Sequence, residues 1–145
     1  MGRSYVLLSN LKTISTIWMI GHSNHPLDRF LEILQQHEIR SILDIRTSPR
    51  SRFPRFNKSA LAAALCTNGI SYSHAPRLGG RDPIPNVDLV RELGVYLPPS
   101  ARTCLMCSEG DPHKCHRHTI IAPLLKQLGY VVRQILPDGT EQEES

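Results

Sequence analysis

The sequence predicts a single α/β domain with a mostly parallel, Rossmann-like sheet of about five strands and helices on both faces. Short apolar runs rich in β-branched residues are typical of buried strands. They alternate with segments that place apolar residues at helical spacing, and short turns join the two kinds of segment. This alternation is typical of a parallel sheet that is covered on both faces. The strands are expected at 15–21, 40–45, 70–74, 102–108 and 130–136.

Four helices are expected between these strands. Pro26 suits the first turn of the first helix, and Asn57 is a good N-cap for an alanine-rich second helix at 58–68. A short helix is expected at 87–95, and the last helix ends at Gly129, a residue type that commonly follows helices.

Length and composition indicate one domain without a membrane span. The chain has 145 residues, of which 40% are hydrophobic and 21% charged, and no apolar run approaches the roughly 20 residues that cross a bilayer. We expect an N-terminal extension at 1–14, the domain at 15–136 and a disordered acidic tail at 137–145. The start is too polar for a secretory signal, so a cytoplasmic location is expected, where cysteines remain thiols.

Charge is unevenly distributed along the chain. The segment 45–81 contains no acidic residue. Its cations are Arg46, Arg50, Arg52, Arg55, Lys58, Arg77 and Arg81. Such a block creates a positive field that attracts phosphate, nucleotides or nucleic acid. The alternative is a basic surface that is merely solvated.

Polar loops follow four of the expected strands. They read GHSNH, DIRTSPRSR, HAPRLGGR and CSEGDPHKCHRH, and they begin at residues 21, 44, 74 and 107. Because parallel strands end at one edge of a sheet, these loops are expected to converge on one rim, where such sheets bind ligands.

Cys107 and Cys115 in the last of these loops are the candidate reactive thiols. Cys115 is expected near a helix start beside His116 and Arg117, where positive charge favours a thiolate. The alternative is that Cys107 is a small core residue and Cys115 a half-buried cap. A zinc site of Cys104 and Cys107 is disfavoured, because two strand residues three positions apart point to opposite faces.

The other candidate residues complete an anion site. Asp44 is expected to orient Arg46 toward the rim, or to form a structural ion pair with it. Arg50, Arg52 and Arg117 would hold the anion together with Ser23 and His116. His22 and Glu109 are candidate proton carriers. A metal held by Cys107, Cys115 and a histidine such as His22 is the remaining option, and no cofactor is otherwise expected.

Several motifs together resemble the family catalogued as domain of unknown function 488. They are a GHS at 21–23, an aspartate-x-arginine at 44–46, Phe56-Asn57, a leucine-glycine-glycine at 78–80, and a cysteine-x-glutamate at 107–109 that closes on Cys115-His116-Arg117. The resemblance implies an α/β fold and a pair of functional cysteines, but no reaction. Pro123 departs from the pattern and is expected to kink the last helix.

The function that these observations favour is an enzyme acting on a phosphate-bearing or nucleic-acid-derived substrate. A non-catalytic nucleic-acid-binding module that uses the basic loop 46–58 is the alternative, and the metal site is a second one.

Overall fold

The computed structural model describes residues 16–79, 86–97, 102–115 and 117–144, except for the side chains of residues 86, 117 and 118. The expected extension at 1–14 lies outside the described residues. One sheet of six strands, in the order β3-β2-β4-β1-β5-β6, forms the centre. Its strands are β1 (Thr16–Gly21), β2 (Ser41–Asp44), β3 (Ser71–His74), β4 (Thr103–Cys107), β5 (Val131–Ile135) and β6 (Glu141–Glu143).

The strands β1 to β5 pair in parallel, which confirms the predicted α/β class. The prediction of about five strands was one short, because β6 adds an antiparallel edge to β5. Residues 141–143 were expected to belong to a disordered tail and instead form this strand. They are ordered because Glu141 accepts hydrogen bonds from Arg133 of β5 and His37, and such cross-strand charge pairs stabilise short edge strands.

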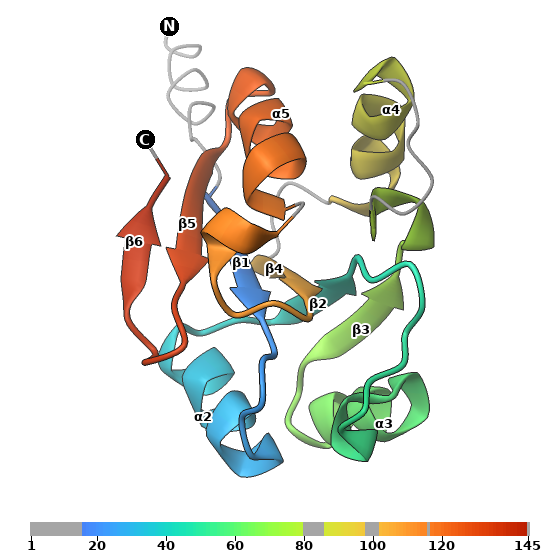
Figure 1. The fold of residues 1–145 in the computed structure, drawn as a ribbon, viewed down its shortest axis with the longest axis vertical. Coiled ribbons are helices and arrows are strands. Elements are labelled where there is room, and N and C mark those ends of the chain that lie inside the picture. The colour runs from blue at the N-terminus through green and yellow to red at the C-terminus, as the bar shows by residue number, and fades with distance from the viewer. Residues whose placement is uncertain (1–15, 80–85, 98–101, 116, 145) are drawn as a thin grey trace, which may run out of the picture.

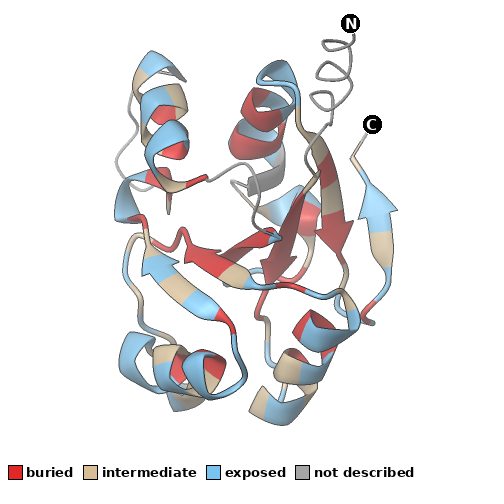
Figure 2. Cartoon of the chain, turned by 180° about the vertical axis from the view of Figure 1, so that it is seen from behind, coloured by how far each residue is buried: buried red, intermediate tan, exposed pale blue. Residues whose placement is uncertain are grey.

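Helices cover both faces of the sheet, as Figure 1 shows. The helices α2 (Leu27–Gln36) and α3 (Lys58–Thr67) lie on one side, and α4 (Asn86–Tyr96) and α5 (Ala122–Gln127) on the other. The central strands between them are almost entirely buried (Figure 2). Within the described residues, none of the helices is long and apolar enough to cross a membrane.

Each face of the sheet has its own apolar core. Residues of β1, β2 and β4 that face α2 and α3 pack with Phe30, Ile33 and Leu34 of α2 and Leu61 and Leu65 of α3. The alternate residues of the same strands face α4 and α5 and pack with Leu89, Leu93, Leu124 and Leu125. This period of two is the pattern of a strand buried on both faces.

The last helix is irregular next to Pro123, where the sequence predicted a kink. A π-helical turn (Arg117–Ile121) precedes α5, and Pro123 lies in the first turn of α5. Helix irregularities of this kind are typical of the neighbourhood of a proline, which lacks the backbone N–H.

The chain connections around β4 lead to opposite faces of the sheet, which creates a topological switch point. The strands β1 and β2 lie on either side of β4 and lead into α2 and α3, whereas β4 leads into α5 on the opposite face. The loops that leave β4 and its neighbours therefore diverge at the carboxyl edge of the sheet. Ligand sites of open α/β sheets form at such switch points.

Candidate anion-binding site

A pocket of about 600 Å³ lies at this switch point. The loops after β1, β2 and β4 contribute its walls, so three of the four polar loops predicted to converge do meet there. The lining residues are His22, Ser23, Asn24, Arg50, Ser51, Arg52, Phe53, Ser108, Glu109 and Gly110. The fourth loop, after β3, is described only as far as Gly79, which lies against the backbone of the second loop at Ile45 and Thr47.

The loop after β2 is fixed by hydrogen bonds along its length. Asn57 occupies the N-cap position of α3, as predicted, but its side chain accepts a bond of 2.7 Å from the Ser51 N–H instead of capping the helix. Arg55 donates to the carbonyl oxygens of His25 and Asn24 at 2.7 and 3.0 Å. These bonds hold the loop against its own helix and against the loop after β1, so this wall of the pocket has a defined conformation.

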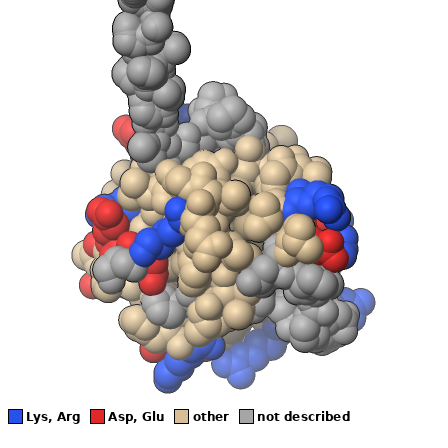
Figure 3. Space-filling model, turned by 90° about the horizontal axis from the view of Figure 1, so that it is seen from above, with Lys and Arg blue, Asp and Glu red and all other residues tan. Residues whose placement is uncertain are grey.

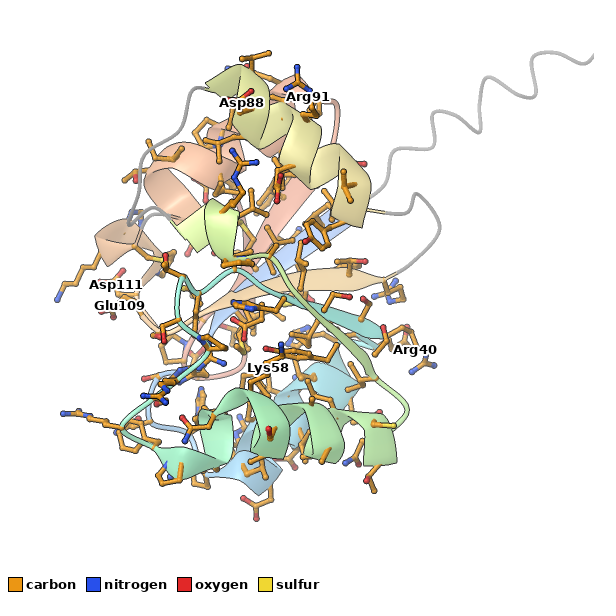
Figure 4. The ribbon with its side chains drawn as sticks, turned by 90° about the vertical axis from the view of Figure 1, so that its right-hand side faces the viewer. Arg40, Lys58, Asp88, Arg91, Glu109 and Asp111 are labelled. Carbon is orange, nitrogen blue, oxygen red and sulfur yellow. The ribbon has the colours of Figure 1, made fainter. Side chains whose placement is uncertain are left out.

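Two exposed arginines from this loop border the pocket. Arg50 and Arg52 both line it, and the Arg52 guanidinium lies 5.0 Å from the centre of the Phe53 ring. Arg55 lies 4.8 Å from the centre of the same ring, so the aromatic surface is already used by two cations. On the β4 side, Glu109 supplies a carboxylate. Figure 4 shows Glu109 and Asp111 at the opposite end of the sheet from Arg40, which precedes β2.

Asp44 and Arg46 form a buried bidentate ion pair. The Arg46 side chain donates from Nε and Nη2 to the two carboxylate oxygens at 2.9 and 2.7 Å, and the Arg46 N–H adds a third bond at 3.1 Å. Only 4% of the Arg46 side chain is exposed and none of Asp44, and Arg46 is not among the pocket residues. The geometry therefore favours the structural ion pair over a direct anion ligand.

His22 lies between this ion pair and the pocket. Its Nδ1–H donates to the Ser23 carbonyl at 2.8 Å, so Nε2 carries the lone pair and faces Arg46 Nη1 at 3.5 Å. Its ring stacks on Phe56 with 4.3 Å between centres. Burial is the main cause that lowers the pKa of His22 from 6.5 to about 4, and the nearby Arg46 charge adds to it. His22 is thus neutral near pH 7 and serves as an acceptor.

Tyr72 and His74 belong to the same network and were not predicted as site residues. The Tyr72 hydroxyl donates to Asp44 at 2.5 Å, and His74 Nε2 donates to the Arg46 carbonyl at 2.7 Å. Burial and the bond to Asp44 raise the pKa of Tyr72, so the hydroxyl keeps its proton. The sequence contained one signal, the alternation of Tyr72 and His74 on an expected strand, and the structure pairs these two residues with Ile42 and Asp44.

Ser23 connects the loops after β1 and β4. Its N–H donates to the Ser108 carbonyl at 2.9 Å, and its φ of 52° is a left-handed conformation that non-glycine residues rarely adopt. A side chain at Gly110 would meet Ser23 at 3.2 Å. Two pocket walls therefore touch here, and unusual backbone conformations of this kind are concentrated at functional sites.

The two candidate thiols lie together. The sulfur atoms of Cys107 and Cys115 are 3.0 Å apart. Cys107 belongs to the core facing α4 and α5, and Cys104 to the core facing α2 and α3, which confirms that these two point to opposite faces. Neither Cys107 nor Cys115 lines the pocket, although Ser108, Glu109 and Gly110 between them do.

Two predicted anion ligands are outside what the structure describes. His116 is not described, and of Arg117 only the backbone is, at the start of the π-helical turn. Among the described residues, there is no group of three or more histidine, cysteine, aspartate or glutamate side chains that could hold a metal ion.

Fold and pocket together define a single-domain α/β protein with a basic pocket at the carboxyl edge of its sheet. The family model described as "Domain of unknown function DUF488" matches residues 26–87, which confirms the resemblance to this family. The matched segment runs from just before α2 to the start of α4 and contains the ion pair and the arginine wall; the GHS at 21–23 and the two thiols lie outside it. No curated protein and no solved structure matches the chain.

Proposed function

We propose that this protein is an enzyme that binds a phosphate-bearing small molecule in the switch-point pocket. The observation that carries the proposal is the position of Arg50 and Arg52 on one wall of a pocket at the carboxyl edge of the sheet. Its volume of about 600 Å³ falls in the range of small-molecule sites, roughly 300–1,000 Å³.

The charges around the pocket support an anionic ligand. Two arginines face one carboxylate, Glu109, and the neutral His22 adds no negative charge. The side chains of Ser23, Ser51 and Ser108 bring hydroxyl groups to the walls. Guanidinium and hydroxyl donors are the groups that proteins use to hold phosphate oxygens.

The base of the pocket, formed by His22 and the Asp44–Arg46 ion pair behind it, is held in one geometry. Arg46 is held by Asp44 and directs Nη1 at His22, whose ring is also stacked on Phe56. In this proposal Asp44 and Arg46 hold His22 in place at the base of the pocket. Glu109 exchanges protons with the substrate, because it is the carboxylate of the pocket lining.

Titration calorimetry with inorganic pyrophosphate and a nucleoside monophosphate tests the proposal. We expect binding that Arg50→Gln and Arg52→Gln each weaken about tenfold or more, because a charged hydrogen bond contributes about 1.5–3 kcal/mol. The matched control is Arg40→Gln, which removes the same charge from an exposed residue at the opposite end of the sheet and should bind as the unchanged protein does. Equal weakening by all three variants, or no binding at all, would contradict a specific site.

Nucleic acid is the second candidate ligand, and one observation favours it. A second hollow of about 670 Å³ adjoins the first at Arg50 and Ser51, which line both, and it is also bordered by Lys58. Two adjoining basic hollows suit a phosphodiester backbone. Binding of a single-stranded oligonucleotide should then fall steeply with salt concentration and weaken in Lys58→Gln. Pyrophosphate binding should be insensitive to Lys58→Gln.

A further inference from the structure

Cys107 and Cys115 are brought together by a short, ordered loop. Cys107 ends β4, and its carbonyl accepts a bond of 2.9 Å from the His22 N–H, which fixes the strand end. A 3₁₀ turn (Pro112–Lys114) precedes Cys115, and Asp111 closes that turn by accepting from the His113 N–H at 3.0 Å. The Cys115 N–H donates to the Pro112 carbonyl, which places its sulfur against the strand end.

We propose that Cys107 and Cys115 form a redox couple that exchanges with low-molecular-weight disulfides. A disulfide bond is about 2.05 Å long, so the two sulfurs at 3.0 Å need to approach by only about 1 Å. The other two cysteines lie elsewhere in the fold. Cys104 lies in the opposite core, and Cys66 is exposed on α3.

Burial assigns different roles to the two thiols. Cys107 is only 8% exposed, whereas Cys115 is half-buried and reachable from solvent. Cys115 is therefore the attacking thiol, and Cys107 is the resolving thiol, which reacts only with a sulfur already delivered to it.

The exchange proceeds in two balanced steps. The Cys115 thiol loses its proton, and its sulfur attacks a small disulfide, forms a mixed disulfide and expels one thiolate, which takes up a proton. The Cys107 thiol then loses its proton and attacks the Cys115 sulfur, which forms the intramolecular disulfide and expels the second thiolate. Two protein thiols are oxidised by two electrons, and one small disulfide is reduced to two thiols.

This redox couple goes beyond the proposed function and does not require an anion in the pocket. Three residues between the cysteines, Ser108, Glu109 and Gly110, nevertheless line that pocket. Closing the disulfide therefore acts on a segment that forms one pocket wall.

Mass spectrometry of the protein incubated with oxidised glutathione tests the inference. All measurements use the Cys66→Ser background, because the exposed Cys66 would form a mixed disulfide of its own. We expect this protein to lose the mass of two hydrogens and, after digestion without reductant, to yield one peptide pair joined through Cys107 and Cys115. Adding Cys107→Ser should trap one glutathione on Cys115. Adding Cys115→Ser instead should leave Cys107 unmodified.

The inference is overturned if the Cys66→Ser protein keeps both hydrogens in fully oxidised glutathione, or if the joined peptides contain Cys104. Peptide mapping of the Cys66→Ser protein decides this even if the added serine variants do not fold. Pyrophosphate titration of the same Cys66→Ser protein separates the two proposals. Pyrophosphate binding by a protein that forms no Cys107–Cys115 disulfide would support the proposed function and overturn the redox couple. A disulfide in a protein that does not bind pyrophosphate would support the redox couple and contradict the proposed function.

Discussion

At the scale of single residues, the base of the pocket depends on a buried charge pair that shares one carboxylate among several donors. Asp44 accepts three bonds from Arg46 and one from Tyr72, which satisfies both of its oxygens. A buried pair of this kind gives little net stability, but loss of one partner leaves an uncompensated charge and costs about 3–5 kcal/mol. The pair therefore fixes the geometry around His22 more than it stabilises the fold.

Protonation of His22 should destabilise the protein in acid. Its pKa is about 4 in the folded protein and 6.5 when exposed, so the unfolded chain binds the extra proton first as the pH falls. The stability linked to neutral His22 is complete above pH 6.5 and is lost as the pH falls toward 4, by up to about 3 kcal/mol. Urea unfolding at several pH values should show this slope, and His22→Gln should flatten it. The same slope in the variant would contradict the assignment.

The pairing of Asp44 with Arg46 could be predicted from the sequence, but its burial could not. The aspartate-x-arginine spacing predicted the pairing of Asp44 with Arg46, because residues two apart on a strand share a face. It could not tell whether the arginine faces the ligand or the interior, since burial depends on the neighbouring β3 and on Tyr72, which come from a distant segment.

At the scale of elements, Gly79 fixes how the segment after β3 packs on the segment after β2. A methyl group at Gly79 would lie 2.8 Å from the Ile45 carbonyl and still closer to Thr47. Gly79→Ala should therefore destabilise the protein by about 1–3 kcal/mol in urea unfolding, as overpacked backbone contacts do.

The control for Gly79→Ala is Gly94→Ala. Gly94 lies in α4, and a methyl group there would meet nothing within 4 Å. Because alanine is the better helix former, Gly94→Ala should stabilise the protein by about 0.5–1 kcal/mol. Losses of equal size at both glycines would show that the close approach to Ile45 and Thr47 does not matter.

The elements that the sequence predicted are those with a clear local signal. The strands β1 and β4 and the helix α3 were predicted within one residue at each end, and Pro26 marked the start of α2. Each of these elements contributes several apolar side chains to a core. The π-helical turn before α5 and the strand β6 were missed. Their conformations depend on Pro123 in the following turn and on charged partners across the sheet, which a local apolar pattern does not encode.

At the scale of the whole molecule, strand order decides where the pocket lies. Polar loops after several strands predicted one rim, and the structure gathers three of them around β4 because β1 and β2 lie on either side of it. The sequence alone does not state this order.

The surface over α4 and α5 shows mostly uncharged side chains, with charged groups at its margins (Figure 3), so the arginine wall is not part of a uniformly basic surface.

The contacts of Glu141 join segments that lie more than one hundred positions apart in the chain. Its carboxylate accepts hydrogen bonds from His37, at the end of α2, and from Arg133 of β5. Partial burial raises the pKa of Glu141, but these bonds outweigh it and hold that pKa below its usual value. The carboxylate is therefore ionised near pH 7 and holds β6 to the rest of the domain.

Removing this carboxylate should weaken the whole fold rather than β6 alone. We expect Glu141→Ala to lower the free energy of unfolding by about 1–3 kcal/mol, measured by circular dichroism and by fluorescence of Trp18 in β1. Glu143→Ala on the same strand is the control, because Glu143 is 61% exposed and lies 3.4 Å from Arg133, a contact that contributes at most about 1 kcal/mol. Coincident shifts of the two unfolding midpoints in Glu141→Ala would show that β6 unfolds with the domain, whereas an unchanged midpoint by Trp18 fluorescence would show that β6 detaches independently.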